Sequence, residues 1–255
     1  MPWRDLPAFT PDWSLPAGVR VLQTECGRGP LPYGEFNLGD HVGDDPARVH
    51  ANRQRLMRAT GVTPVWLRQV HGTMVVDASG CNTEKTPQET PEADAALTQR
   101  RGIACAVLTA DCLPVLIADR LARVVGAAHA GWRGLAAGVI EELIDAMLRV
   151  PEVKNHDLAV WLGPAIGPKA FEVGQDVADA FLAQSALHAG CFKPHPAKPG
   201  KLLADLPGLA VNVLQAKGIV DITLSGLCTA SLEDRFYSYR RTGVTGRMAS
   251  LIWLQ

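Results

Sequence analysis

The most regular feature of the chain is a set of three short apolar runs that follow one another closely. They span Ile103 to Thr109, Leu113 to Asp119, and Arg123 to Ala128. Each run is continuously apolar and does not alternate with polar residues. That pattern is typical of strands in a sheet that is covered on both faces. We therefore expect three buried strands in the middle of the chain.

Helical patterns occur on both sides of these runs. From Gly131 to Val150, large apolar residues recur at helical spacing and acidic residues occupy the opposite side, which predicts one helix over the whole segment. A second helix is predicted to begin at Asp44, Asp45 and Pro46, since an acidic cap followed by proline favours a first turn. It should run to about Ala59 and end near Gly61.

The remaining elements alternate with loops. Strands are predicted at residues 19–23, 64–70, 73–77, 158–162, 220–224 and 248–254, and further helices near residues 176–186 and 209–217. The strands at 64–70 and 73–77 should be joined at His71 and Gly72, and the polar segment from Ser79 to Pro91 should be an exposed loop. No repeat or linker divides the pattern. We expect one mixed α/β unit over residues 1–255.

Composition and charge narrow the class of protein. The 255 residues are 47% hydrophobic and 20% charged, with a net charge of -1. This balance gives no reason to expect a nucleic acid or a membrane as partner. The N-terminus resembles no signal peptide, so we expect a cytoplasmic protein. The six cysteines form no CxxC pair, and in a reducing compartment a special cysteine would be a metal ligand or a nucleophile.

Reactive residues gather in three short segments among small residues. These are QVHG with His71, TADCLP with Cys112, and HAGWRG with His129. The spacings do not match a zinc finger, but two imidazoles and one thiolate suit a catalytic zinc that keeps a fourth position open. Each of the three could also be an ordinary core residue, in which case Cys105 and Cys228 would be equally good candidates.

Other segments suggest where an anion or a substrate would bind. Arg133 lies at the start of the predicted helix, where free N–H groups and the helix dipole favour an anion. The loop from Phe36 to His41 offers the polar side chains of Asn37 and His41. Near the C-terminus, three arginines lie among glycines and hydroxyls, which suits either a surface charge cluster or a phosphate-binding loop. They are Arg240, Arg241 and Arg247.

Taken together, these segments resemble the YfiH-type family, also called the laccase-domain, multifunctional purine nucleoside phosphorylase or peptidoglycan-editing factor family. The resemblance extends from about Val19 to the end of the chain. It is carried by FNLGDHVGDD, QVHG, ADAALT, LTADCLPV, GAAHAGWRG, LGPAIG, CT and FYSYRRTGVTGR. The resemblance implies an α+β fold with mixed β-sheets flanked by helices in α/β/β/α layers, forming a single YfiH-like catalytic domain over residues 1–255.

The resemblance also implies a metal and an activity. Zinc would be bound by His71, Cys112 and His129, which match the family's motifs residue by residue. The implied reactions are phosphorolysis of adenosine, inosine, guanosine and methylthioadenosine, and deamination of adenosine. The partners would be a purine nucleoside and phosphate. For the substrate we predict a role for Asn37, His41, Arg133 and Arg240, whereas the sequence leaves the oligomeric state open and is compatible with a monomer.

Two other enzyme classes and one binding class remain as alternatives. Cys112 could be the nucleophile of a hydrolase that edits peptidoglycan precursors, with His71 or His129 as its base. A copper polyphenol oxidase fits less well, because its chemistry needs several coppers and the seven histidines include no His-x-His pair. The non-enzymatic alternative is an interaction module that zinc stabilises.

Overall fold

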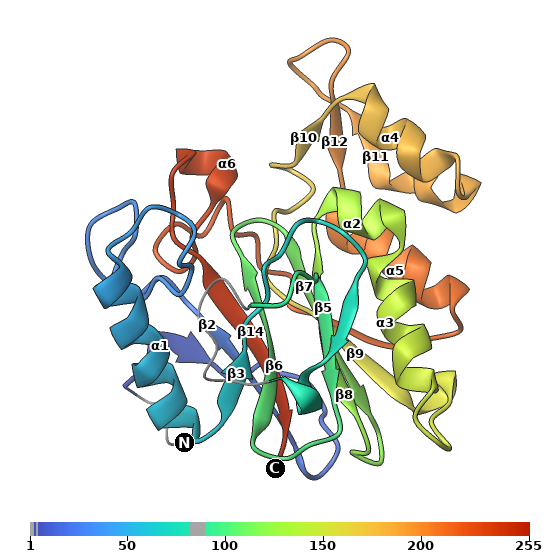
Figure 1. Ribbon diagram of the computed structural model, residues 1–255. Coiled ribbons are helices and arrows are strands. Elements are labelled where there is room, and N and C mark those ends of the chain that lie inside the picture. The colour runs from blue at the N-terminus through green and yellow to red at the C-terminus, as the bar shows by residue number, and fades with distance from the viewer. Residues whose placement is uncertain (1–2, 4, 82–89) are drawn as a thin grey trace.

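The computed structural model describes residues 3, 5–81 and 90–255, and it places two large β-sheets face to face between helices (Figure 1). One sheet has five strands in the order β1-β2-β14-β6-β3, and the other has six in the order β13-β9-β7-β8-β5-β4. Helix α1 covers the outer face of the first sheet, and α2, α3 and α5 cover the second. This is the α/β/β/α layering that the family resemblance implied.

The pairing within the two large sheets is mixed. The pairs β3–β6, β4–β5 and β9–β13 are parallel, and the others are antiparallel. The strands of the first sheet are β1 (Ala8–Phe9), β2 (Val19–Thr24), β3 (Thr63–Val65), β6 (Ile103–Thr109) and β14 (Met248–Leu254). Those of the second are β4 (Val75–Asp77), β5 (Ala95–Thr98), β7 (Leu113–Asp119), β8 (Val125–Ala130), β9 (Leu158–Leu162) and β13 (Asp221–Leu224).

A small third sheet and the helices complete the molecule. The third sheet, in the order β10-β12-β11, projects from the body next to α4 (Figure 1). Its strands are β10 (Glu172–Val173), β11 (Phe192–Pro194) and β12 (Leu202–Ala204). The α-helices are α1 (Pro46–Thr60), α2 (Trp132–Ala137), α3 (Val139–Leu148), α4 (Gln175–Leu182), α5 (Leu206–Ala216) and α6 (Tyr239–Thr242). Short 3₁₀ helices span Ala78–Gly80, Asn155–Asp157 and Ala186–Cys191.

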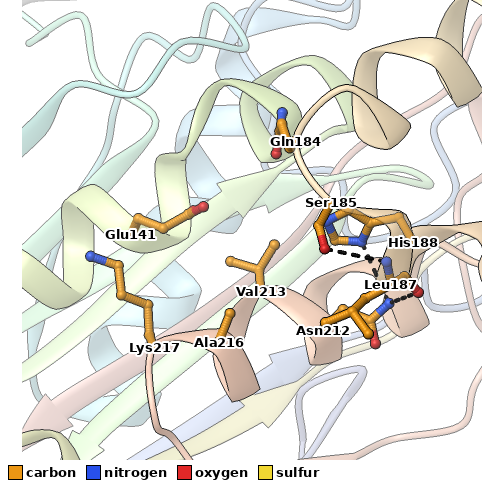
Figure 2. A pocket seen from close by; sticks show the side chains of 9 residues that line it. All are labelled: Glu141, Gln184, Ser185, Leu187, His188, Asn212, Val213, Ala216 and Lys217. Carbon is orange, nitrogen blue, oxygen red and sulfur yellow. Dashed lines mark hydrogen bonds between the residues drawn. The ribbon is translucent and has the colours of Figure 1, made fainter.

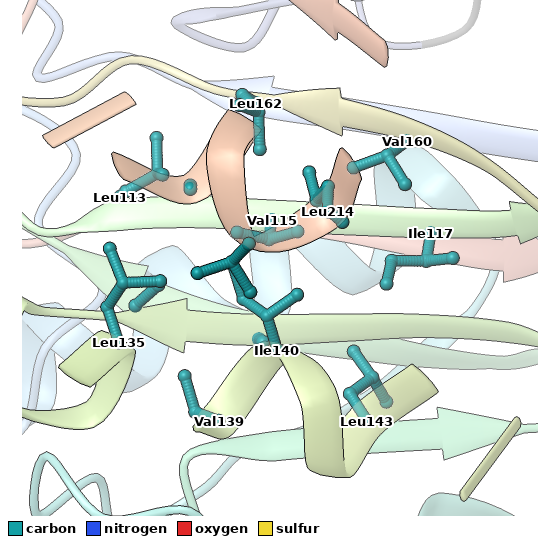
Figure 3. Packing of buried hydrophobic residues seen from close by; sticks show 14 of the residues in the cluster. Leu113, Val115, Ile117, Leu135, Val139, Ile140, Leu143, Val160, Leu162 and Leu214 are labelled. Atoms are coloured by element: carbon teal, nitrogen blue, oxygen red, sulfur yellow. The ribbon is translucent and has the colours of Figure 1, made fainter. Parts of the chain in front are cut away.

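The continuous apolar runs are explained by burial of both faces of each sheet. On β7, Leu113, Val115 and Ile117 pack against the helical layer (Figure 3). The alternate residues Leu116 and Ala118 pack between the two sheets. Because successive side chains on a strand point to opposite faces, both sets must be apolar. The predicted burial of these strands is confirmed.

Two predicted elements are wrong in their extent. The segment from Gly131 to Val150 is two helices, because Gly138 adopts a left-handed conformation with φ 100° and ends α2. The segment 64–70 is a strand only to Val65, and β3 and β4 lie in different sheets, so they do not form a hairpin. Hydrophobic spacing does not reveal either break, since the apolar residues continue through both.

The other predicted elements occur close to their expected positions. Helix α1 is capped by Asp45 and ends at Gly61, which has φ 70°. The helix predicted near 176–186 ends at Leu182. Residues 82–89 of the predicted loop lie outside the described residues. Among the residues that are described, no helix combines the length and apolar character needed to cross a bilayer.

Candidate metal centre

Three sequence-predicted ligands meet at one end of the two-sheet sandwich. Cys112 lies in the turn that carries the chain from β6 to β7, and so from one sheet to the other. His129 lies near the end of β8, and His71 lies in the loop before β4. In the β7–β8 pairing, Leu113 is opposite Ala130, which brings Cys112 and His129 to the same edge. The fold therefore brings together residues that are 41 and 17 positions apart in sequence.

The geometry of the three side chains suits a single metal ion. Their ligand atoms all lie within 4.8 Å of one another, and Cys112 Sγ is 3.6 Å from His71 Nε2. Ligands bound to one tetrahedral zinc lie roughly 3.3–3.6 Å apart, as follows from metal–ligand bonds of about 2.0–2.3 Å. Within the described part of the chain this is the one such cluster of histidine, cysteine and carboxylate groups. A thiolate with two imidazoles is a donor set that fits zinc.

Asp94 connects two of the candidate ligands. Its Oδ1 accepts a hydrogen bond from His129 Nδ1 at 2.8 Å and from the backbone N–H of His71 at 3.0 Å. Its Oδ2 accepts from the N–H groups of Val70 at 3.1 Å and Gly72 at 2.7 Å. When Nδ1 of His129 donates to a carboxylate, Nε2 carries the lone pair that a metal needs. Asp94 therefore fixes the His71 loop and the tautomer of His129 together.

Sequence reasoning quoted the segment that contains Asp94 but gave this residue no role. The carboxylate of Asp111, the residue before Cys112, accepts hydrogen bonds from Thr229 Oγ1 at 2.6 Å and Ser238 Oγ at 3.0 Å, and from the backbone N–H of Arg240 at 2.7 Å. Asp111 thus ties the C-terminal segment to the Cys112 turn. A polar residue immediately before an apolar strand was the only signal for Asp94.

The electrostatics of the cluster favour an ionised thiol. Burial opposes ionisation of Cys112, but the neighbouring His129 and His71 outweigh it and lower the pKa of the thiol to about 6. Burial likewise opposes protonation of His129, yet the Cys112 thiolate and Asp94 raise the pKa of this imidazole to about 9. A thiolate is the form that binds a metal or attacks an electrophile. The Cys112 thiolate beside His129 can therefore either bind a metal or act as a nucleophile.

Gly131 leaves room for the cluster. A Cβ at this position would lie 2.6 Å from His71 Cδ2 and 3.0 Å from Cys112 Sγ. The backbone of Gly131 has φ -66°, which any residue can adopt. The requirement for glycine is therefore steric, because no side chain fits between the helix start and the two candidate ligands.

The backbone on two sides of the cluster is held in uncommon conformations. His71 has φ 61° and Asp111 has φ 89°, both in the left-handed region. Such conformations cost about 1–3 kcal/mol each and persist where surrounding contacts enforce them. The hydrogen bonds of Asp94 and Asp111 supply those contacts. Gln69 adds a further one, since its side chain bonds both the N–H and the carbonyl of Leu108 at 2.8 Å.

A cavity of about 530 Å³ opens beside the three candidate ligands. Three of the predicted substrate residues, His41, Arg133 and Arg240, line it. Asn37 does not, because it is buried and its side-chain amide bonds Gly39, Asp44 and Arg247 within the protein. Asn37 thereby shapes the loop that carries His41.

Two further arginines differ in their surroundings. Arg247 lines the cavity, and among the described residues its side chain donates hydrogen bonds only from Nη1, to the carbonyls of Thr245 at 2.9 Å and Gly246 at 3.0 Å. Burial lowers the pKa of its guanidinium, and no carboxylate forms an ion pair with it among the described residues. Arg241 is instead bound to the carbonyls of Thr229, Ala230 and Phe236 and does not line the cavity.

Aromatic side chains form another part of the cavity wall. They are Trp132, Phe171 and Tyr239. The guanidinium of Arg133 lies 4.6 Å from the Trp132 ring, and that of Arg240 lies 5.6 Å from Phe171. The cavity therefore combines flat apolar surfaces with cations. Such a site suits a planar aromatic ligand that is accompanied by an anion.

The two alternative cysteines lie elsewhere. Cys105 is fully buried between the sheets, and burial raises the pKa of its thiol. Cys228 Sγ accepts a hydrogen bond from the backbone N–H of Gly167 at 3.2 Å and does not line the cavity. Neither belongs to the cluster of candidate ligands.

Comparisons with known proteins agree with this architecture. The family model described as multi-copper polyphenol oxidoreductase laccase matches residues 20–255. A purine nucleoside phosphorylase of Pseudomonas aeruginosa is 48% identical over 97% of this chain and 98% of its own. The purine nucleoside phosphorylase YfiH of Escherichia coli is 45% identical over 96% of this chain and 98% of its own.

Solved structures extend the agreement to the fold. A Neisseria meningitidis protein, described as a member of the family DUF152, superimposes with a TM-score of 0.87 at 44% identity, over 98% of this chain and 99% of its own. YfiH of Bacillus licheniformis gives a TM-score of 0.86 at 28% identity, over 93% of both chains. The chain therefore belongs to the YfiH-type laccase-domain family.

Proposed function

We propose that this protein is a zinc-dependent purine nucleoside phosphorylase that acts on adenosine, inosine, guanosine and methylthioadenosine and also deaminates adenosine. The observation that carries the proposal is the combination, in one cavity, of a His/Cys/His cluster, aromatic walls and cations. The names of the relatives from Pseudomonas aeruginosa and Escherichia coli support the phosphorylase activity. A cavity of about 530 Å³ is within the range that small-molecule ligands occupy.

In phosphorolysis, a phosphate oxygen forms a bond to the anomeric carbon of the ribose as the bond from that carbon to the purine nitrogen breaks. The electron pair of the broken bond leaves with the purine, which takes up a proton, and the other product is ribose 1-phosphate. The residues of this chain must therefore hold an anion near the sugar and supply a proton near the base. Zinc, when bound, supplies a Lewis acid that polarises a substrate oxygen.

We assign the anion to the arginines that line the cavity. Arg247 is the strongest candidate because it is partly buried and none of the described carboxylates is paired with it. Arg133 adds a cation that can move, since it is exposed and stacks on Trp132. Arg240 is less free, because its Nη1 donates to the carbonyl of Glu172 at 2.7 Å. A partly buried cation without a carboxylate partner is stabilised by a phosphate and gains more from it than an exposed cation does.

His41 is the candidate proton donor to the leaving purine. It lines the cavity from the loop that Asn37 holds, and its Nδ1 lies 3.5 Å from Asp40 Oδ1. The side chain of His41 is 58% exposed, so it can exchange protons with solvent. The interaction with His41 comes first among the causes that lower the pKa of Asp40 to about 2, and this carboxylate therefore stays charged beside the imidazole. A histidine paired in this way suits general acid catalysis.

Product analysis with purified protein tests the proposal. When inorganic phosphate is present, adenosine should yield adenine, inosine through deamination, and hypoxanthine from phosphorolysis of that inosine. The amount of ribose 1-phosphate should equal the sum of adenine and hypoxanthine. Without phosphate only the deamination product should form. Absence of adenine, inosine and hypoxanthine at high protein concentration, with zinc supplied, would refute both activities.

A second candidate function follows from the ionised state of Cys112. A thiolate beside two imidazoles is also the arrangement of a cysteine hydrolase, which could act on an amide of a peptidoglycan precursor. The two candidates differ in what zinc does. A hydrolase should form a covalent acyl-enzyme on Cys112 that mass spectrometry detects, and zinc should inhibit it. A phosphorylase should form no such adduct and should require zinc.

A further inference from the structure

Arg53 of helix α1 contacts the loop that carries His41 at two points. Its Nε donates a hydrogen bond to the carbonyl of Leu38 at 2.9 Å. Its Nη1 lies 3.0 Å from Asp40 Oδ2, so the guanidinium also forms an ion pair with the residue before His41. A guanidinium is planar and holds its N–H groups in a fixed fork. The two contacts together therefore restrain the loop immediately before His41.

The guanidinium of Arg53 is itself held in place. It lies 4.4 Å from the ring centroid of Trp66, a distance at which a cation is attracted to the face of the ring. Trp66 in turn packs against the cluster of buried residues that includes Leu38 and Leu56. Burial lowers the pKa of Arg53, and the charge of Asp40 opposes that effect. A stacked, partly buried cation of this kind can determine where the more exposed Asp40 carboxylate lies.

Asp40 extends this restraint to His41. Its Oδ2 faces Arg53, and its Oδ1 lies 3.5 Å from His41 Nδ1. One carboxylate thus connects the cation on α1 with an imidazole that lines the cavity beside the metal centre. With Nδ1 directed at Asp40, Nε2 is the ring nitrogen that remains for a substrate.

Lys217 forms a comparable ion pair elsewhere in the molecule. Its Nζ is bound to both carboxylate oxygens of Asp145 at 2.8 and 2.9 Å. The two side chains are 30% and 47% exposed, against 17% and 40% for Arg53 and Asp40. Lys217 lies beside a separate cavity of about 230 Å³ (Figure 2), which among the described residues shares no lining residue with the cavity beside the metal centre. This pair therefore provides a matched control.

We propose that Arg53 is a positioning residue for the phosphorolysis reaction. It holds Asp40, and Asp40 holds the imidazole of His41 so that Nε2 faces the leaving purine. In the reaction, Nε2 gives its proton to a purine nitrogen as the electron pair of the glycosidic bond moves onto the purine. Arg53 does not line the cavity, so it acts through His41 and not on the substrate. This inference rests on the function proposed above and adds the residue that orients its general acid.

A double-mutant cycle tests this role, with inosine phosphorolysis in the presence of zinc as the assay. Arg53→Met removes the charge and the N–H donors but keeps an unbranched side chain beside Trp66. We expect kcat to fall about tenfold or more and the KM for phosphate to stay within twofold. In a His41→Ala background the same substitution should change kcat by less than twofold, because the group that it positions is already absent. Lys217→Met, the matched control, should leave kcat unchanged.

The leaving group provides a second measurement. The purine of 7-methylguanosine already carries a positive charge on its imidazole ring, so it leaves without taking up a proton. Arg53→Met should therefore cleave 7-methylguanosine at a rate within twofold of that of the unmodified protein, while its cleavage of guanosine falls about tenfold. A general loss of structure would slow the cleavage of both nucleosides alike.

Three results would overturn the role of Arg53 while the unmodified protein is active. They are an unchanged kcat in Arg53→Met, an equally large fall of kcat in the His41→Ala background, and equal slowing of guanosine and 7-methylguanosine cleavage. Unmodified protein that cleaves none of these nucleosides would instead refute the proposed function, and the inference with it.

Discussion

Replacing Asp94 by asparagine should weaken metal binding although Asp94 is not itself a candidate ligand. The carboxylate accepts four hydrogen bonds, two on each oxygen, from Val70, His71, Gly72 and His129. An asparagine has one oxygen and one NH₂ group. In either orientation of the amide, the NH₂ group faces two N–H donors, so at least two hydrogen bonds are lost.

The magnitude follows from the number of bonds lost. Hydrogen bonds to charged groups contribute about 1.5–3 kcal/mol each, so losing two from this buried carboxylate should destabilise the fold by about 3–6 kcal/mol. Removing a carboxylate that orients a metal-binding histidine typically lowers metal affinity by about 10- to 100-fold. We therefore expect Asp94→Asn to bind zinc at least tenfold more weakly than the unmodified protein.

Competition with a chromophoric chelator measures the zinc affinity, and thermal unfolding with and without chelator measures the stability. Asp119→Asn provides a matched control, because Asp119 is also a buried carboxylate with several hydrogen bonds, to Arg123. It lies at the other end of β7 from Cys112, about 20 Å away along the strand. The control should lose stability but keep its zinc affinity. Equal zinc affinity in Asp94→Asn and the unmodified protein would refute the positioning role of Asp94.

Four further predictions concern the same site. Gly131→Ala should lower the zinc affinity by tenfold or more, because the added Cβ would displace His71 and Cys112. Gly190→Ala is the control, since a Cβ there meets nothing within 4 Å, and it should leave the zinc affinity unchanged in the same competition assay. In metal-free protein the alkylation rate of Cys112 should rise with a midpoint near pH 6, and zinc should protect the thiol; a midpoint near 9 would contradict the assigned electrostatics. Arg247→Met should raise the KM for phosphate about tenfold or more in steady-state assays, with little change in the KM for nucleoside. The folded state holds the pKa of Asp94 below the ordinary 3.8, so the stability that the Asp94 carboxylate contributes is complete above pH 3.8 and is lost as the pH falls through the lowered pKa. The unfolding free energies of Asp94→Asn and of the unmodified protein should therefore converge in acid. A difference between these two free energies that stays constant down to pH 2 would contradict this prediction.

Burial of the central strands could be predicted from their apolar pattern, whereas the layering of the fold was implied by the family resemblance. The runs that became β6, β7 and β8 are apolar on both faces, and that is what burial between another sheet and helices requires. The break at Gly138 could not be predicted with the same means. Apolar residues continue on both sides of it, and one glycine in a helical pattern does not by itself specify a left-handed residue.

The three candidate ligands were found because each lies in a short segment of small residues near a strand end. The residues that orient them were harder to find. Asp94 acts through backbone groups at positions 70–72, and no spacing in the sequence indicates that pairing. Asn37 was expected to contact substrate, but its amide is used within the loop, since a polar side chain in a glycine-rich turn often bonds its own backbone.

The measurement that tests the central claim most directly is the dependence of inosine phosphorolysis on bound metal. Protein freed of metal by a chelator is titrated with zinc, and the rate at which ribose 1-phosphate forms is followed at each step. Our account predicts no activity without metal and a linear rise that ends at one zinc per chain. Full activity in the metal-free protein, or activity that requires several equivalents of copper, would contradict it.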